Sequence, residues 1–191
     1  MDQRGLAKRI AVGRDGRLSS PSLASHLIDG LVAGGAEIFD IGCGPTPMLY
    51  YANEALATEA AIQVTGSHNP PTHNGFKMVM GGAVFFGDDI TRLGAVSAAG
   101  STRHAGGQRT EISIFDDYVA RILQGADVGT VTAVWDCGNG ASGEVTDALT
   151  RQLSGTHHVL FSEIDGTFPN HHPNPVDPET LDMLRDAVTE H

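Results

Sequence analysis

The sequence predicts an α/β fold: a mixed, mostly parallel sheet sandwiched by helices, followed by the start of a second, similar unit. Short apolar runs alternate with stretches in which apolar residues recur at helical spacing. Glycine-rich and proline-rich turns separate these stretches along the whole chain. Strands that alternate with helices favour parallel pairing through right-handed crossovers, so two successive α/β units are expected.

The first unit begins with an expected strand at residues 9–12, which ends in the turn 13–16. Ser20-Pro21 is typical of a helix start, with serine as the N-cap and proline in the first turn, and this helix is expected to end at Gly34-Gly35. The next expected elements are a strand at 38–41, a helix at 48–57, a strand at 60–64, a hairpin with arms at 75–80 and 83–86, and a helix at 88–98.

Residues 99–107, AGSTRHAGG, are small, polar and glycine-rich, and they predict a loop or linker. A helix at 112–124 is expected to join the two halves. The second unit is expected to contain a strand at 131–136, a helix at 141–153, a strand at 157–162, an irregular proline-rich crossing and a helix at 178–189. We therefore predict a first domain over residues 1–108 and a partial second domain over residues 109–191.

Composition limits the possible partners. The chain has 12 Lys and Arg against 23 Asp and Glu, a net charge of −11, which repels nucleic acid but leaves room for a sugar phosphate held by local cations. Its two cysteines are too few for a disulfide framework, and no cysteine–histidine spacing indicates zinc. The chain begins without a signal-peptide core and has no apolar run of about 18 residues, so we expect a soluble cytoplasmic protein with no membrane partner.

A first candidate site is the run Gly138-Asn139-Gly140-Ala141-Ser142-Gly143. It has the G-x-G-x-x-G form between an expected strand and an expected helix, and Glu163 follows about 20 residues later, as in dinucleotide-binding units. A tight strand-to-helix turn that needs glycine only for its geometry fits the same residues. Few residues follow Glu163, which favours the plain turn.

A second candidate is the loop Thr65-Gly66-Ser67-His68-Asn69-Pro70, which follows an expected strand and is followed by Lys77. The loop is neither a G-x-S-x-G nucleophile elbow nor a P-loop. An exposed serine beside an imidazole, with a lysine nearby, suits a phosphoryl carrier. An ordinary Asn-Pro turn with serine as a cap fits as well, and the residues alone favour that interpretation.

Five motifs follow one another along the chain. They are VGRDGRLSSP at 12–21, PTP with Tyr50-Tyr51 at 45–51, VTGSHNPPTHNGFK at 64–77, DCGNGASG at 136–143 and DGTFPNHHPNP at 165–175. In this order they resemble the α-D-phosphohexomutase family, especially its bacterial phosphomannomutase/phosphoglucomutase branch, and residues 64–77 resemble its phosphoserine loop. Thr65-Gly66-Ser67 is closer to the mannose/glucose branch than to the alanine-serine form of glucosamine mutases. The family's pattern makes the glycine-rich run a turn of the second domain.

The resemblance implies a mechanism in which Ser67 carries a phosphate and exchanges it with a hexose 1- or 6-phosphate. Mg²⁺ would contact this phosphate, Lys77 would stabilise phosphoryl oxygens, and His68 would handle a proton or shape the loop. Glucose or mannose 1,6-bisphosphate would be the activator. His171-His172 falls in the family's proline-rich segment, where a packing role is expected rather than metal binding.

Several parts of the family's pattern are not found in these 191 residues. They are the opening Tyr-Asp-x-Arg-Gly strand with its helix, the Asp-Gly-Asp-Gly-Asp metal loop, and the sugar- and phosphate-binding loops of the later domains. We therefore expect a fragment with little or no mutase turnover of its own, and self-association through an exposed sheet edge. A catalytically inactive remnant and, less favoured, a dinucleotide-binding module remain the alternatives.

Overall fold

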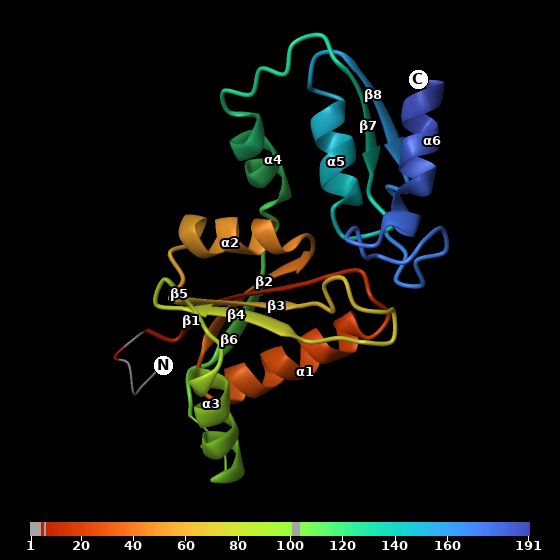
Figure 1. Ribbon diagram of the computed structural model, residues 1–191. Helices are drawn as coiled ribbons and strands as arrows, with labels where there is room; N and C mark the ends of the chain where they lie inside the picture. Colours follow the sequence, from red (N-terminus) through yellow and green to blue (C-terminus); the bar gives the residue numbers. More distant parts are fainter. Residues whose placement is uncertain (1–4, 6, 101–103) are drawn as a thin grey trace.

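Six strands form the main sheet in the order β5-β4-β3-β1-β2-β6 (Figure 1). The computed structural model describes residues 5, 7–100 and 104–191. The strands are β1 (Arg9–Arg14), β2 (Glu37–Cys43), β3 (Ala60–Val64), β4 (Phe76–Met80), β5 (Ala83–Val84) and β6 (Gln108–Glu111). β1 pairs in parallel with both β2 and β3, and β6 pairs in parallel with β2. β4 and β5 continue the sheet in antiparallel fashion. The predicted mixed, mostly parallel sheet is therefore confirmed.

Helices cover both faces of this sheet. α1 (Ser20–Ala33) lies on one face, and α2 (Thr46–Ala55) lies on the other (Figure 1). Side chains of β1 alternate between the two faces, as the period of a strand requires. Ile10 and Val12 belong to the apolar cluster that contains Ile28 of α1, whereas Ala11 packs in the cluster of α2.

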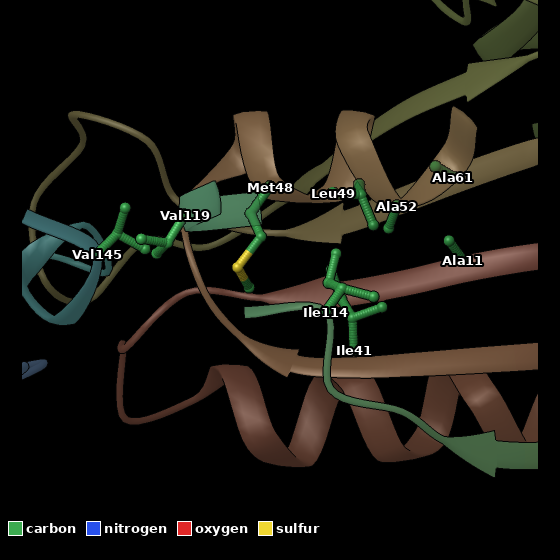
Figure 2. Packing of buried hydrophobic residues seen from close by; sticks show 9 residues of the cluster. All are labelled: Ala11, Ile41, Met48, Leu49, Ala52, Ala61, Ile114, Val119 and Val145. Carbon is green, nitrogen blue, oxygen red and sulfur yellow. The ribbon is translucent and has the colours of Figure 1, made fainter. Parts of the chain in front are cut away.

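The cluster under α2 also connects the first unit to the second. α4 (Phe115–Leu123) follows β6 and places Val119 beside Val145 of α5 (Gly143–Thr150), as Figure 2 shows. Met48 and Leu49 of α2 lie in the same buried cluster. The two units therefore share one apolar core, which fixes the second unit against the first.

The second unit is a two-stranded parallel sheet of β7 (Thr132–Asp136) and β8 (Thr156–Leu160). α5 connects the two strands. The chain then runs through an irregular crossing segment, which we define as residues 163–175, to a 3-10 helix at Pro178–Leu181 and α6 (Asp182–Glu190). The strand–helix–strand pattern predicted for this half is confirmed, with a parallel pairing.

Most differences from the predicted elements concern their ends. The predicted hairpin is present, with Gly81 and Gly82 both at positive φ, as a two-residue I′ turn requires. Ser20 was predicted as an N-cap, and this prediction is wrong. Ser20 is the first helical residue, and its hydroxyl is donated to Asp15 instead of capping α1. α2 begins at Thr46, earlier than predicted, because proline is tolerated in a first helical turn.

β6 has no counterpart among the predicted strands. Its four residues, QRTE, are all exposed, so no apolar alternation marks them as a strand. β6 pairs with β2 and spans the predicted domain division after residue 108. Residues 101–103 of the predicted linker lie outside the described residues. α3 (Asp88–Ala98) is a helix as predicted, although none of its residues is buried. Among the described helices, none has the length and apolarity needed to cross a membrane.

Candidate functional site

The site lies at the carboxyl ends of the parallel strands. The connection from β1 to β2 runs over one face of the sheet, and the connection from β2 to β3 runs over the other (Figure 1). Such a reversal beside a central strand opens a crevice beyond the strand ends, where α/β proteins bind ligands. The loops after β1, β2 and β3 meet there. Asp15 N donates to Val64 O at 2.9 Å, and Gly44 N donates to Arg14 O at 2.9 Å.

Ser67 is exposed at the tip of the loop after β3 and has a left-handed backbone, with φ +53°. Thr65 and Gly66, just before it, are buried. The Ser67 N–H is held by Thr65 Oγ1 at 2.9 Å, and the Gly66 N–H is held by Asp15 Oδ2 at 3.2 Å. A non-glycine residue in this region is strained, so the surrounding bonds must hold it. The serine hydroxyl is thus presented to solvent from a rigid base.

Arg17 holds this loop through its main-chain oxygens, a role that was not predicted from the sequence. Its guanidinium donates to the main-chain oxygens of Ser67, Asn69, Pro70 and His73 at 2.7, 2.9, 2.6 and 3.1 Å. The side chain is 1% exposed, so these bonds are protected from water. A planar guanidinium offers five donors in fixed directions, which lysine does not. The motif VGRDGRLSSP contains Arg17, but a motif alone does not show where an arginine points.

Asp15 compensates the buried charge of Arg17. Its carboxylate accepts from Arg17 Nε at 3.1 Å and from the Arg17 main-chain N–H at 3.1 Å, in addition to Gly66 N. Ser20 donates its hydroxyl to the same carboxylate, and Asn74 donates to Ser20 Oγ at 2.8 Å. The carboxylate is therefore saturated by donors of the protein. It acts as an anchor for the loop and offers no free position for a metal.

The predicted catalytic residues line one cavity of about 530 Å³. Ser67, His68 and Lys77 contribute from the first unit, with Lys77 on β4 directly opposite Gln63 of β3. All three predicted catalytic side chains are exposed. Asn69 and Pro70 shape the loop by presenting their carbonyls to Arg17, but they are not among the residues that line this cavity. The cavity can therefore offer a hydroxyl, an imidazole and an ammonium group to one ligand.

The second glycine-rich run lies in the wall of the same cavity. Residues 136–142, at the end of β7, line it together with Phe168 and His171 of the crossing segment. The two candidate sites found in the sequence thus form one cavity rather than two. The Asn139 side chain bonds to Glu163 O at 2.9 Å and to Asn170 at 2.7 Å, so the turn is occupied by the chain's own crossing segment. Glu163 is exposed.

His171 and Asp136 form an ion pair in this wall. His171 Nε2 is 3.0 Å from Asp136 Oδ2, and His171 Nδ1 is 3.1 Å from His172 O. Both partners are acceptors, so these contacts favour the ring with a proton on each nitrogen. Burial lowers the pKa of His171, but the bonds to His172 O and Asp136 offset this, and the pKa is raised above its ordinary value. His171 packs against the turn, where a Cβ on Gly138 would lie 3.1 Å from His171 Cε1.

The described residues do not form a metal cage. No group of three or more His, Cys, Asp or Glu side chains within the described ranges could hold an ion. Asp15 and Asp136 are engaged with Arg17 and His171. Magnesium prefers several oxygen ligands, including carboxylates, and these are not gathered here. The residues present fit only the predicted contact through a phosphate on Ser67.

Comparison with protein families identifies the two units. Residues 2–99 match the model of phosphoglucomutase/phosphomannomutase alpha/beta/alpha domain I, and residues 116–191 match that of domain II. These matches cover most of the chain, and the chain belongs to the phosphoglucomutase/phosphomannomutase family.

Relatives of known name support this assignment. The chain is 42% identical over 183 residues to phosphomannomutase/phosphoglucomutase of Pseudomonas putida, which covers 95% of this chain and 40% of that protein. It is 40% identical over 189 residues to phosphoglucomutase of Neisseria gonorrhoeae, covering 97% of this chain and 41% of that protein. The chain thus spans about two fifths of the length of these curated relatives.

Solved structures show the same fold. A phosphoglucomutase/phosphomannomutase family protein from Burkholderia thailandensis superposes with a TM-score of 0.93 at 37% identity, covering 99% of this chain and 43% of that one. A protein from Thermus thermophilus superposes with a TM-score of 0.78 at 23% identity, covering 97% of this chain and 44% of that one, and supports the fold alone.

Proposed function

We propose that this chain carries the phosphoryl-accepting unit of a hexose-phosphate mutase, with Ser67 as the acceptor. The observation that carries the proposal is the loop itself. Ser67 is exposed and strained at φ +53°, and the buried Arg17 donates to its main-chain oxygen and to that of Asn69, two residues later. Strain held in place by surrounding bonds is typical of functional sites. Substrates are proposed to be the 1- and 6-phosphates of mannose or glucose, as the relatives' names suggest.

In the proposed reaction, the hydroxyl oxygen of Ser67 attacks the phosphorus of a hexose bisphosphate. The bond between that phosphorus and the sugar oxygen breaks, a bond to Ser67 Oγ forms, and the serine proton ends on the sugar hydroxyl. The phosphoserine then passes this phosphoryl group to the free hydroxyl at the other position of a second hexose monophosphate. The bond from phosphorus to Ser67 Oγ breaks, a new bisphosphate forms, and the proton of that hydroxyl returns to Ser67. His68 is proposed to pass the proton, and Lys77 to balance charge on the phosphoryl oxygens, since phosphoryl transfer depends mainly on positioning and charge.

Mg²⁺ is proposed as a cation at the phosphoserine and a hexose 1,6-bisphosphate as the activator. The described residues supply no further ligand cage, so we assign no step of the reaction to the metal. We expect little or no mutase turnover from the 191-residue chain alone. We propose that the chain works in the cytoplasm, with hexose phosphates and not nucleic acid as partners, in keeping with its net charge of −11.

Phosphate uptake tests this proposal. The purified chain is incubated with glucose 1,6-bisphosphate and Mg²⁺, and its intact mass is measured over time. One added phosphoryl group is expected on the wild-type chain and none on Ser67→Ala. A wild-type chain that takes up no phosphate would favour the inactive remnant. A rise in melting temperature with NAD would instead favour a dinucleotide site at 138–143.

Self-association is also proposed, between two copies of this chain. Apolar side chains are exposed near the short edge strand β5: Val84 is 63% exposed and Phe86 is 71% exposed. Ile90 and Leu93 of α3 are exposed as well. Short edge strands and exposed apolar patches both favour contact with another chain. A sedimentation coefficient that rises with protein concentration, and rises less in Phe86→Ser, is expected. A monomer at every concentration would contradict this.

A further inference from the structure

Two residues with a left-handed backbone, one from each unit, contact Arg17. Ser67 has φ +53° in the loop of the first unit, and Phe168 has φ +52° in the crossing segment of the second. The Phe168 ring lies over the Arg17 guanidinium, 5.2 Å from Cζ to the ring centroid. A left-handed backbone is unusual for a bulky aromatic residue and persists only where its surroundings impose it. The second unit therefore covers the group that holds the phosphoserine loop.

The main chains of the two units touch at this point. Gly166 is buried, and a Cβ on it would lie 2.5 Å from Gly16 O and 2.7 Å from Leu18 N. A Cβ on Gly16 would likewise collide with Ile164. Neither turn has room for a side chain at the contact. The position of Phe168 over Arg17 is therefore set by direct contact of two backbones rather than by a flexible side chain.

Asn139, in the glycine-rich turn, holds the crossing segment on both sides of Phe168. It is buried, its amide nitrogen donates to Glu163 O at 2.9 Å, and its amide oxygen accepts from Asn170 Nδ2 at 2.7 Å. Its main-chain oxygen accepts from Asp165 N at 3.0 Å, and Asp165 O accepts from Phe168 N at 3.0 Å. A continuous series of contacts thus runs from the turn of the second unit to the loop of the first.

We propose that Asn139 and Phe168 are positioning residues for the phosphoserine loop and act on it through Arg17. The role of this loop in phosphoryl transfer rests on the proposed function. The series of contacts from Asn139 to the loop does not depend on that function. The proposal gives the G-x-G-x-x-G turn a role that is neither nucleotide binding nor mere chain reversal. The turn anchors the segment that covers Arg17, so the geometry of Ser67 depends on the docked second unit.

Hydrogen exchange of the loop amides, followed by mass spectrometry on the full chain, tests the proposal. Phe168→Leu removes the ring over Arg17, and exchange in residues 65–75 is expected to rise about threefold to fivefold. Phe168→Tyr keeps a ring and should restore slow exchange. Phe161→Leu is the matched control, because Phe161 also has φ +52° but contacts His171 instead of Arg17. This control should leave exchange in the loop unchanged.

Equal loop exchange in Phe168→Leu and wild type would overturn the proposal, and so would an equal rise in Phe161→Leu. Should Phe168→Leu not fold, loop exchange is measured in Asn139→Gly instead and is expected to rise. Glycine keeps the left-handed backbone of residue 139 and removes only its side-chain bonds. The rate of phosphate uptake on Ser67 is measured in parallel and should fall in Phe168→Leu and recover in Phe168→Tyr. A wild-type chain without uptake would contradict the proposed function, while the exchange comparison would still decide the coupling.

Discussion

Arg17 donates to the main-chain oxygen of Ser67 at 2.7 Å, so the proposed phosphoryl acceptor is held by a buried cation below its own backbone. This bond is one of four from the same guanidinium to the loop. The charge of Arg17 is balanced by Asp15, whose Oδ2 lies 3.1 Å from Arg17 Nε. Arg17 therefore needs no bound phosphate to hold the loop.

Arg17→Lys should lower the free energy of unfolding by about 2 to 3 kcal/mol, because an ammonium group cannot donate to four carbonyls at once and leaves buried acceptors unpaired. Urea unfolding followed by circular dichroism measures this. Arg14→Lys is the matched control, since Arg14 lies in the same GRDGR run and its guanidinium makes a long bond of 3.4 Å to Asp15 O. Equal losses in both variants would contradict the assignment of Arg17.

Gly66→Ala should also destabilise the loop. A Cβ on Gly66 would lie 2.5 Å from Arg17 Nε and 2.6 Å from His73 O, so either the loop or Arg17 must move. A loss of about 2 kcal/mol in the free energy of unfolding is expected, together with slower phosphate uptake. Gly75→Ala is the control in the same loop, because a Cβ there meets Thr65 O at an ordinary 3.5 Å. A Gly66→Ala chain as stable as Gly75→Ala would refute this packing.

Ser67→Gly should be more stable than Ser67→Ala by about 1 kcal/mol, although neither variant can accept a phosphate. The reason is the φ of +53° at Ser67, which glycine adopts without a Cβ penalty. Thermal unfolding of the two variants measures the difference. A Ser67→Ala chain that is as stable as Ser67→Gly, or more stable, would show that the left-handed backbone is not kept in solution.

Stability should fall as pH rises through the pKa of His171. Burial works against the charged imidazole, but the His172 carbonyl and Asp136 raise the pKa in the folded chain above its ordinary value of 6.5. The folded chain therefore binds the proton more tightly than the unfolded chain. The resulting stability is full below the ordinary pKa of 6.5 and is lost as pH rises through the higher pKa of the folded chain. Melting temperatures of wild type and His171→Gln should converge over this range. A constant difference between them would contradict the ion pair with Asp136.

Apolar periodicity was sufficient for most of the fold. It placed α1, α2 and every strand but one, and Gly81-Gly82 marked the hairpin, because these elements bury one face or need a specific turn. It missed β6, whose exposed polar residues gain their structure only by pairing with β2. Such an edge strand has no local pattern that distinguishes it from a loop.

The site was predictable only in its exposed part. Ser67, His68 and Lys77 were found from their motif, and the structure brings all three to one cavity. Arg17 and Phe168 were not found, because their role depends on contacts between segments far apart in the chain. The glycine-rich run 138–143 was a rival site in the sequence. The structure places residues 138–142 of it in the wall of the same cavity, which also depends on contacts between distant segments.

Locating the phosphate within the chain tests the central claim most directly. After incubation with glucose 1,6-bisphosphate and Mg²⁺, proteolytic peptides are sequenced by tandem mass spectrometry, with Lys77→Ala analysed beside the wild type. The account predicts a single phosphorylated residue, Ser67, with slower uptake in Lys77→Ala. No phosphate on the chain, or phosphate on other serines or threonines with Ser67 unmodified, would contradict it.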